Sequence, residues 1–175
     1  MAGYSGIEID APESVEFSTA VGKFLMNFGV LEFFTYEIIR IISRKQEVYE
    51  SYLGASFGRR LTYIKDCIYQ EDFSKEQKKY FEEAIESARV MADVRAWVAH
   101  NPVCLGEEVE ENGNKVTYIK IMKMNAPRNA VPGMNIEQLN KGVDLVHELA
   151  HDFDVMYQAV VAICALRESS INLSP

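Results

Sequence analysis

Arg95 is the first residue whose type and position suggest chemistry. At about 100° per residue it falls inside an apolar helical stripe that includes Met91 and Val98. A guanidinium keeps its proton, so there it needs a carboxylate, carbonyl groups or an anionic ligand. Glu32, at the edge of an earlier apolar stripe, is the internal candidate. A buried Arg95–Glu32 pair that fixes helix packing and a bound anion are both compatible with this spacing.

His100 follows five residues later, just before Asn101-Pro102. Because proline disfavours the helical conformation in the residue before it, we expect the helix to end here and the histidine to be at least partly exposed. A histidine at a helix C-terminus complements the helix dipole. Histidine is also the side chain most often used as a general acid or base.

A second histidine pair lies in the run His147-Glu148-Leu149-Ala150-His151, which fits the zinc-peptidase pattern H-E-x-x-H. Histidines four residues apart share a helix face and can bind one metal. Here they fall on the polar side of their helix, and no third ligand follows at the zincin spacing. We therefore expect two solvated histidines, no metal and no cofactor, and rank a metallopeptidase as the third hypothesis.

Helical periodicity and capping patterns predict the elements that carry these residues. Three long helices are expected at about 12–43, 75–101 and 136–167, and one short helix at 57–69. Residues 44–56 are expected to form a polar connector, and residues 1–10 a loose N-terminal arm.

Two β-prone runs, 103–109 and 116–122, flank the turn signal Asn112-Gly113. They predict a β-hairpin insertion at 103–124, before the last helix. Each long helix has one wide apolar face, and the simplest way to bury these faces is a helical bundle. The expected fold is a single all-α domain over 1–175, with three long helices, one short helix and the inserted hairpin.

Composition narrows the function classes. The chain has 175 residues, is 48% hydrophobic and carries a net charge of −8. This charge excludes a nucleic-acid-binding protein that is basic over its whole surface, but it does not exclude a local basic cleft. Its three scattered cysteines indicate a reducing compartment. The chain shows neither a secretory leader nor a stretch of 18 uncharged apolar residues. We therefore expect a soluble cytoplasmic protein without membrane association.

The segment from Arg95 to Asn101 resembles the motif of the HEPN family (higher eukaryotes and prokaryotes nucleotide-binding domains). In that family an arginine, four to six further residues and a histidine stand near the end of a late helix. Arg95, Ala99, His100 and Asn101 match the pattern. The residue after the arginine is usually polar, often asparagine, and here it is Ala96. The long first helix with its Leu31-Glu32 pair is also similar to the family.

The resemblance implies a HEPN-like helical bundle and metal-independent cleavage of RNA. In that chemistry a 2′-hydroxyl attacks the neighbouring phosphate and leaves a cyclic phosphate and a free 5′-hydroxyl. His100 would act as base or acid, and Arg95 would stabilise the developing phosphoryl charge. Glu32 and Asn101 would support this pair, and Trp97 is the candidate for stacking on an RNA base.

The resemblance also implies partners. A two-fold homodimer with the motifs face to face would supply two histidines and two arginines to one site. The leading hypothesis is thus a dimeric endoribonuclease, a toxin or defence component with an antitoxin-type protein partner. The alternative, favoured by Ala96 and the acidic composition, is a non-catalytic HEPN-like dimeric module that binds a nucleotide, an RNA or a partner protein.

Overall fold

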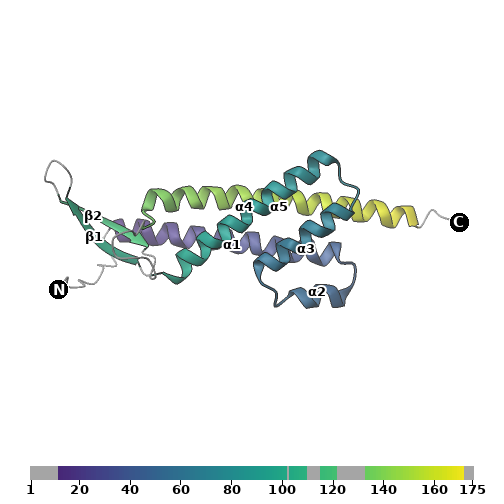
Figure 1. The fold of residues 1–175 in the computed structure, drawn as a ribbon, viewed down its shortest axis with the longest axis horizontal. Helices are drawn as coiled ribbons and strands as arrows, with labels where there is room; N and C mark the ends of the chain where they lie inside the picture. The colour runs from purple at the N-terminus through teal and green to yellow at the C-terminus, as the bar shows by residue number, and fades with distance from the viewer. Residues whose placement is uncertain (1–11, 102, 110–114, 122–132, 172–175) are drawn as a thin grey trace. The chain divides into compact units, whose positions relative to one another are not determined.

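The computed structural model describes residues 12–101, 103–109, 115–121 and 133–171 of the chain. The elements are α1 (Pro12–Ile42), α2 (Gln46–Tyr52), α3 (Phe57–Gln70), α4 (Lys75–His100), β1 (Val103–Val109), β2 (Lys115–Ile121) and α5 (Ile136–Ile171) (Figure 1). They fall into two compact units. The first unit comprises Met1–Met26 and Val94–Asp144, and the second comprises Asn27–Asp93 and Leu145–Pro175.

Local capping contacts set the starts of the helices. The Ser74 hydroxyl accepts a hydrogen bond from the Gln77 amide, and the Gln77 side chain accepts one from the Ser74 amide. Asn135 and Gln138 make the same reciprocal pair at the start of α5. Ser56 caps α3 through its side chain. Each cap satisfies backbone N–H groups that have no partner inside the helix, so these starts coincide with the sequence predictions.

The predicted HEPN-like bundle of three long helices and one short helix was wrong. The described residues form five helices, and two of them, α2 and α3, are short. Helix α2 occupies part of the predicted connector at 44–56 and buries none of its residues. Its seven residues are also fewer than the window of about 11–18 residues over which helical periodicity is read. A hydrogen bond of 2.9 Å from the Gln46 side chain to Glu50 supports it, at the i,i+4 spacing typical of helices.

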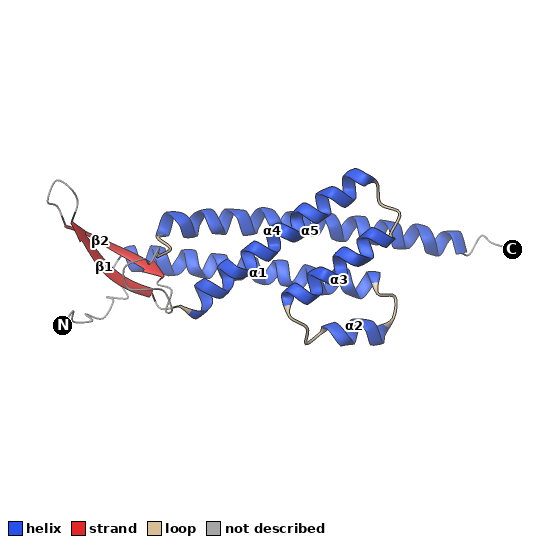
Figure 2. Ribbon diagram, viewed as in Figure 1, coloured by secondary structure: helices blue, strands red, loops and turns tan. Residues whose placement is uncertain are grey.

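The two strands pair antiparallel, with Val103 opposite Ile121 and Val109 opposite Lys115 (Figure 2). The second strand covers Lys115–Ile121, so it begins one residue before the predicted run at 116–122, whose last residue lies outside the described residues. The predicted arm at 1–10, the turn between the strands and the rest of the predicted insertion up to residue 124 lie outside the described residues.

The first unit has its own apolar core. Its buried side chains come from α1, the end of α4, the end of β2, the segment before α5 and the start of α5. They are Phe17, Ala20, Phe24, Val98, Ile121, Met134 and Leu139. Ile121 and Met134 exchange two backbone hydrogen bonds of 3.1 and 3.2 Å, which tie the end of β2 to the segment before α5. Gly142 of α5 lies against the ring of Phe24.

The contact between Gly142 and Phe24 predicts opposite effects for two glycine substitutions in helices. A Cβ at position 142 would stand 3.3 Å from the fully buried Phe24 ring, whereas a Cβ at Gly29 would meet no atom within 4 Å. Gly29→Ala should stabilise the protein by up to about 1 kcal/mol through helix propensity. Gly142→Ala should destabilise it by about 1 kcal/mol, because overpacking outweighs that gain. Urea unfolding of both variants tests this, and equal stabilisation would contradict the packing.

The second unit is a bundle of helix segments around a larger core. Its fully buried side chains include Leu31, Ile38, Leu61, Ile64, Phe81, Ile85 and Phe153. Helix α3 runs alongside α4, and the Lys65 ammonium joins them through ion pairs of 2.7 Å to Glu82 and 3.0 Å to Glu86 (Figure 1). Helices α4 and α5 are linked by a 2.5 Å hydrogen bond from the Tyr80 hydroxyl to Asp152.

Helix α5 bears on the expectation that nothing spans a membrane. Its stretch Ile136–Arg167 is long and apolar enough to cross a bilayer by length and composition alone, with a mean hydropathy of 1.3 over its most apolar window. One such helix is weak evidence for a membrane span, because mostly buried core helices of soluble proteins pass the same test, but only 22% of this window is buried inside the molecule. The buried side chains of α5 that face the core of the second unit are Val146, Leu149, Phe153, Met156 and Val160.

Candidate active site

The last two turns of α4 carry the residues of the predicted site. Arg95 is half-buried, and Ala96 and His100 are exposed. The backbone N–H and the side-chain amide of Asn101 both donate to the Trp97 carbonyl, over 3.2 and 2.9 Å. Asn101 thus closes the helix and makes His100 its last residue, so its observed role is to fix the helix end that carries the histidine.

Arg95 has no partner in the part of the chain that the structure describes. It makes neither a hydrogen bond nor an ion pair there, although its side chain is half-buried. A guanidinium in this setting stays charged and offers five donors in a planar fork. That arrangement suits an anionic group such as a phosphate.

The helix geometry separates Arg95 from His100. Five residues advance an α-helix by about 7.5 Å and rotate it by about 140° from one side chain to the other. The two side chains therefore leave the helix on different sides. One phosphate can therefore contact both an arginine and a histidine in two ways. Either the long side chain of Arg95 bends round the helix toward His100, or one of the two residues belongs to a second chain.

Trp97 lies between these two residues and is half-buried. Its indole Nε1 is enclosed by protein and has no hydrogen-bond acceptor among the described residues. A buried N–H without a partner costs about 1–3 kcal/mol. The edge of the ring that carries this nitrogen does not face solvent, so stacking on a base would have to use what remains exposed of the ring. The stacking role stays a prediction.

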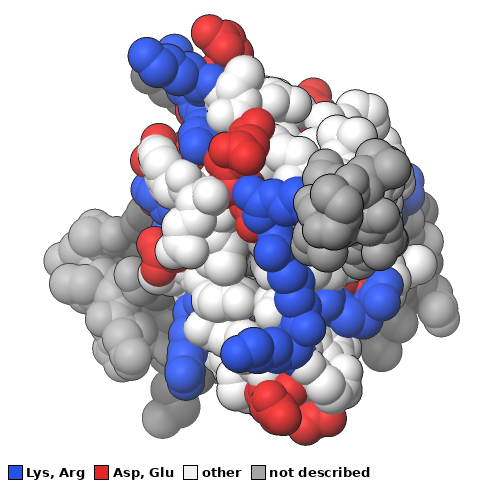
Figure 3. Space-filling model, turned by 90° about the vertical axis from the view of Figure 1, so that its right-hand side faces the viewer, with Lys and Arg blue, Asp and Glu red and all other residues white. Residues whose placement is uncertain are grey.

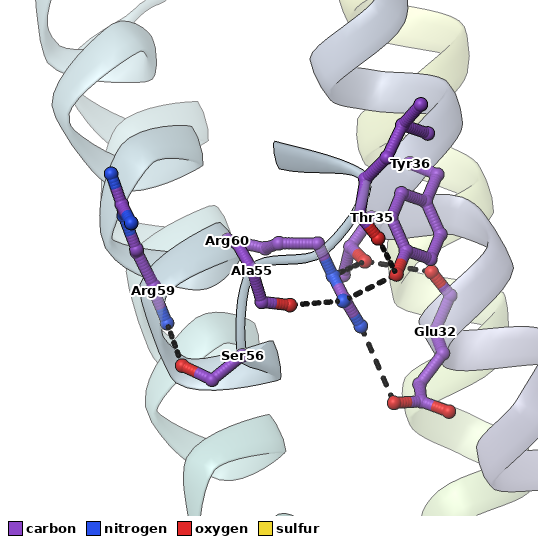
Figure 4. A network of polar contacts seen from close by, with 8 residues as sticks. Glu32, Thr35, Tyr36, Ala55, Ser56, Arg59 and Arg60 are labelled. Carbon is purple, nitrogen blue, oxygen red and sulfur yellow. Dashed lines mark hydrogen bonds and ion pairs between the residues drawn. The ribbon is translucent and has the colours of Figure 1, made fainter. Parts of the chain in front are cut away.

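Glu32 was predicted as the internal partner of Arg95, and this was wrong, because its carboxylate pairs with Arg60. The Arg60 guanidinium donates from Nη2 to Glu32 over 3.3 Å and from Nε to the Thr35 hydroxyl over 2.9 Å. From Nη1 it donates to the Tyr36 hydroxyl over 2.6 Å and to the Ala55 carbonyl over 2.8 Å. These contacts form one network between α1 and the start of α3 (Figure 4).

Arg60 is the buried arginine that sequence reasoning missed. Its side chain is only 3% exposed, and its guanidinium lies 4.1 Å from the centre of the Tyr36 ring. Position 60 stands four and eight residues before the buried Ile64 and Ile68, so it belongs to the apolar face of α3. That spacing was the available signal. Every donor nitrogen of this guanidinium has a partner, which makes the network structural.

The histidines of the H-E-x-x-H run are exposed on α5. Across the described residues, the structure has no group of three or more His, Cys, Asp or Glu side chains placed to hold a metal ion. The predicted pair His147 and His151 therefore lacks a third described ligand.

Several titratable groups with shifted pKa values lie in contacts between helices of the second unit. Hydrogen bonds to Glu82 and Glu86 raise the pKa of Lys65 to about 12, and the pKa of Glu82 is lowered mainly by Lys65. The hydrogen bond to Asp152 raises the pKa of Tyr80 to about 12. Burial raises the pKa of the Cys67 thiol, so this cysteine is not an activated nucleophile. The contacts of Lys65 and Tyr80 hold helices together.

The surface charge is uneven despite the net charge of −8. On the face drawn in Figure 3, Lys and Arg side chains gather in a band, with uncharged surface beside it and acidic side chains near its ends. A local basic band attracts polyanions even on an acidic protein.

Comparison of the chain with models of known protein families, with curated proteins and with solved structures finds no match.

Proposed function

We propose that this protein is a metal-independent endoribonuclease whose catalytic residues are Arg95 and His100. The observation that carries the proposal is that Arg95 is a half-buried cation without a partner among the described residues. An exposed histidine, His100, follows it five residues later on the same helix. The likeness of this segment to the HEPN motif supports the same assignment. An arginine that can bind an anion and an exposed histidine at the same helix end are the residue types that phosphoryl transfer uses, since charge builds on the phosphate oxygens as a proton moves.

The roles of the two residues follow from the steps of the reaction. A neutral His100 imidazole takes the proton of the 2′-hydroxyl as its oxygen forms a bond to the adjacent phosphorus. Arg95 donates hydrogen bonds to the non-bridging phosphate oxygens, where negative charge increases. The bond from phosphorus to the 5′-oxygen then breaks, and an imidazolium gives that oxygen a proton. The products are a 2′,3′-cyclic phosphate and a 5′-hydroxyl.

The reaction needs one proton acceptor and one proton donor, and each chain offers one histidine in this segment. The separation of about 140° between Arg95 and His100 on the helix also makes it hard for one chain to aim both at one phosphate. A two-fold homodimer meets both needs, because His100 of the partner subunit can supply the second proton-transfer group. We therefore place the activity in a homodimer.

We also propose a substrate, a compartment and a biological role. The substrate is RNA, the compartment is the cytoplasm, and the role is that of a toxin or defence component held inactive by an antitoxin-type protein partner. The alternative is a dimeric module that binds a nucleotide, an RNA or a partner protein without cleaving it. The exposed Ala96 favours this alternative, since it offers no polar group beside Arg95.

The proposed chemistry makes a direct prediction about metals and about the sugar. Cleavage of single-stranded RNA should persist in excess EDTA, since neither Arg95 nor His100 needs a metal to act. Matched DNA should stay intact, because it lacks the 2′-hydroxyl nucleophile. Gel electrophoresis with mass spectrometry of the ends checks both. Loss of cleavage in EDTA would reject the mechanism, and tight RNA binding without cleavage would favour the binding module.

A further inference from the structure

The outer face of α1 in the first unit carries an uncharged strip that its own core does not use. The strip consists of Val15, Thr19, Gly22 and Met26, which recur at intervals of four, three and four residues. Val15 is 50% and Met26 74% exposed. No atom lies within 4 Å of where a Cβ at Gly22 would stand.

This spacing is that of the contact positions of a coiled coil, where two helices pack along alternating steps of three and four residues. The buried side of the same segment already uses Phe17 and Phe24. The strip is thus a second apolar face, which a helix covered on one side only would not need. The Thr19 hydroxyl donates to the Val15 carbonyl over 2.7 Å, so its hydrogen needs no acceptor across an interface.

The pattern continues along α1 into the second unit. Steps of three and four residues beyond Met26 reach Gly29 and Phe33, both exposed, and Phe33 is 57% exposed. A Cβ at Gly29 would also meet no atom within 4 Å. The strip of the first unit alone nevertheless fills four contact positions over about 17 Å of helix.

We propose that this strip binds the same strip of a second copy of the chain, antiparallel and around a two-fold axis between residues 20 and 21. In that register Val15 packs on the partner's Met26, and Thr19 packs on the partner's Gly22. Small residues then stand at the centre, where the helix axes approach most closely, and larger side chains close the two ends. An isologous interface repeats every contact twice.

Charge flanking the strip matches the same register. Glu16 and Lys23 are both exposed, and neither makes a hydrogen bond or an ion pair within the described ranges. With the two-fold axis between residues 20 and 21, Glu16 stands opposite residue 25 of the partner. The partner's Lys23 is two residues away from that point, which is about 3 Å along the helix. The two-fold axis creates two such oppositely charged pairs. This complementarity is why we assign the strip to a second copy and not to an unrelated helix.

The interface is independent of the ribonuclease activity, because it follows from the surface of α1 alone. Measurements of mass test it without any cleavage. A dimer that does not cleave RNA would reject the proposed function and keep this interface, whereas an active enzyme that joins through another surface would do the opposite.

A charge-exchange series tests the register by sedimentation velocity at low salt. Glu16→Lys and Lys23→Glu, made singly, should each raise the dimer dissociation constant about tenfold, because two attractive pairs become repulsive. The double variant Glu16→Lys/Lys23→Glu should return to within about threefold of the natural chain, since the pairs are reversed but again opposite. Met26→Lys, which puts a charge into the strip itself, should leave the chain monomeric.

Lys79→Glu is the matched control, because Lys79 is a 78%-exposed lysine of α4 outside the strip, and this change should leave the dissociation constant unaltered. Circular dichroism of each variant checks that the helices are intact, and the exposed charge variants are expected to fold. A monomeric natural chain would overturn the proposal. So would a dimer that survives Met26→Lys, or single charge variants whose defect the double variant does not repair.

Discussion

Arg60→Ala is expected to destabilise the protein by about 3–5 kcal/mol, the cost of breaking a buried ion pair from one side. The change removes the donors that serve the Glu32 carboxylate, the Thr35 and Tyr36 hydroxyls and the Ala55 carbonyl. It also leaves a cavity under the start of α3, since the side chain is only 3% exposed. Unfolding in guanidinium chloride, followed by circular dichroism, measures the loss in the free energy of unfolding.

Arg59→Ala is the matched control for this variant. Arg59 is the preceding residue of the same helix, is exposed, and places its guanidinium 5.5 Å from the centre of the Tyr52 ring. Loss of an exposed contact of this kind costs about 0.5–1 kcal/mol. Equal stability of the two variants would mean that the Arg60 network does not hold α3 to α1.

His100→Ala is expected to lower the rate of RNA cleavage by about 10²–10⁴-fold, the range of general acid–base catalysis, and to leave the unfolding midpoint unchanged. The stability of the fold should not change, because His100 is exposed at the end of α4. Arg95→Ala should also abolish most cleavage, since it removes the cation at the reacting phosphate. Because Glu32 pairs with Arg60, Arg95→Ala does not deprive Glu32 of its partner and should lower the stability of the fold only slightly.

His147→Ala serves as the control for the histidine variant, because it is an exposed helical histidine that the mechanism does not use. Its cleavage rate should equal that of the natural chain. A rate that drops for His147→Ala and not for His100→Ala would move the site to α5.

The helix starts were predictable because capping is local. Ser74 with Gln77, and Asn135 with Gln138, satisfy backbone donors only a few residues away, so the sequence carries the full signal. The long apolar stripe of α1 was predictable for a similar reason, since helical periodicity depends on the chain itself. The end of α4 was predictable from the proline at position 102, which disfavours the helical conformation in the residue before it. The side chain of Asn101 closes the helix at that point.

Partner choice between helices was not predictable in this way. Periodicity puts both Arg60 and Arg95 on apolar stripes, but it does not say which helix faces either of them, and Glu32 pairs with Arg60. Helix α2 was not predicted because seven residues are too few to show a helical period. By helical spacing Ala99 continues the apolar stripe of Met91 and Val98, yet it is exposed, since periodicity does not indicate where along a helix its packing partner stops.

The central claim, cleavage by a 2′-hydroxyl under the control of His100, is tested most directly with a DNA oligonucleotide that contains one ribonucleotide. In excess EDTA the natural chain should cut this strand only on the 3′ side of the ribose and leave a cyclic phosphate there, while His100→Ala should leave it intact. Cleavage at deoxyribose positions, linear phosphate ends formed at once, or full activity of His100→Ala would contradict the account.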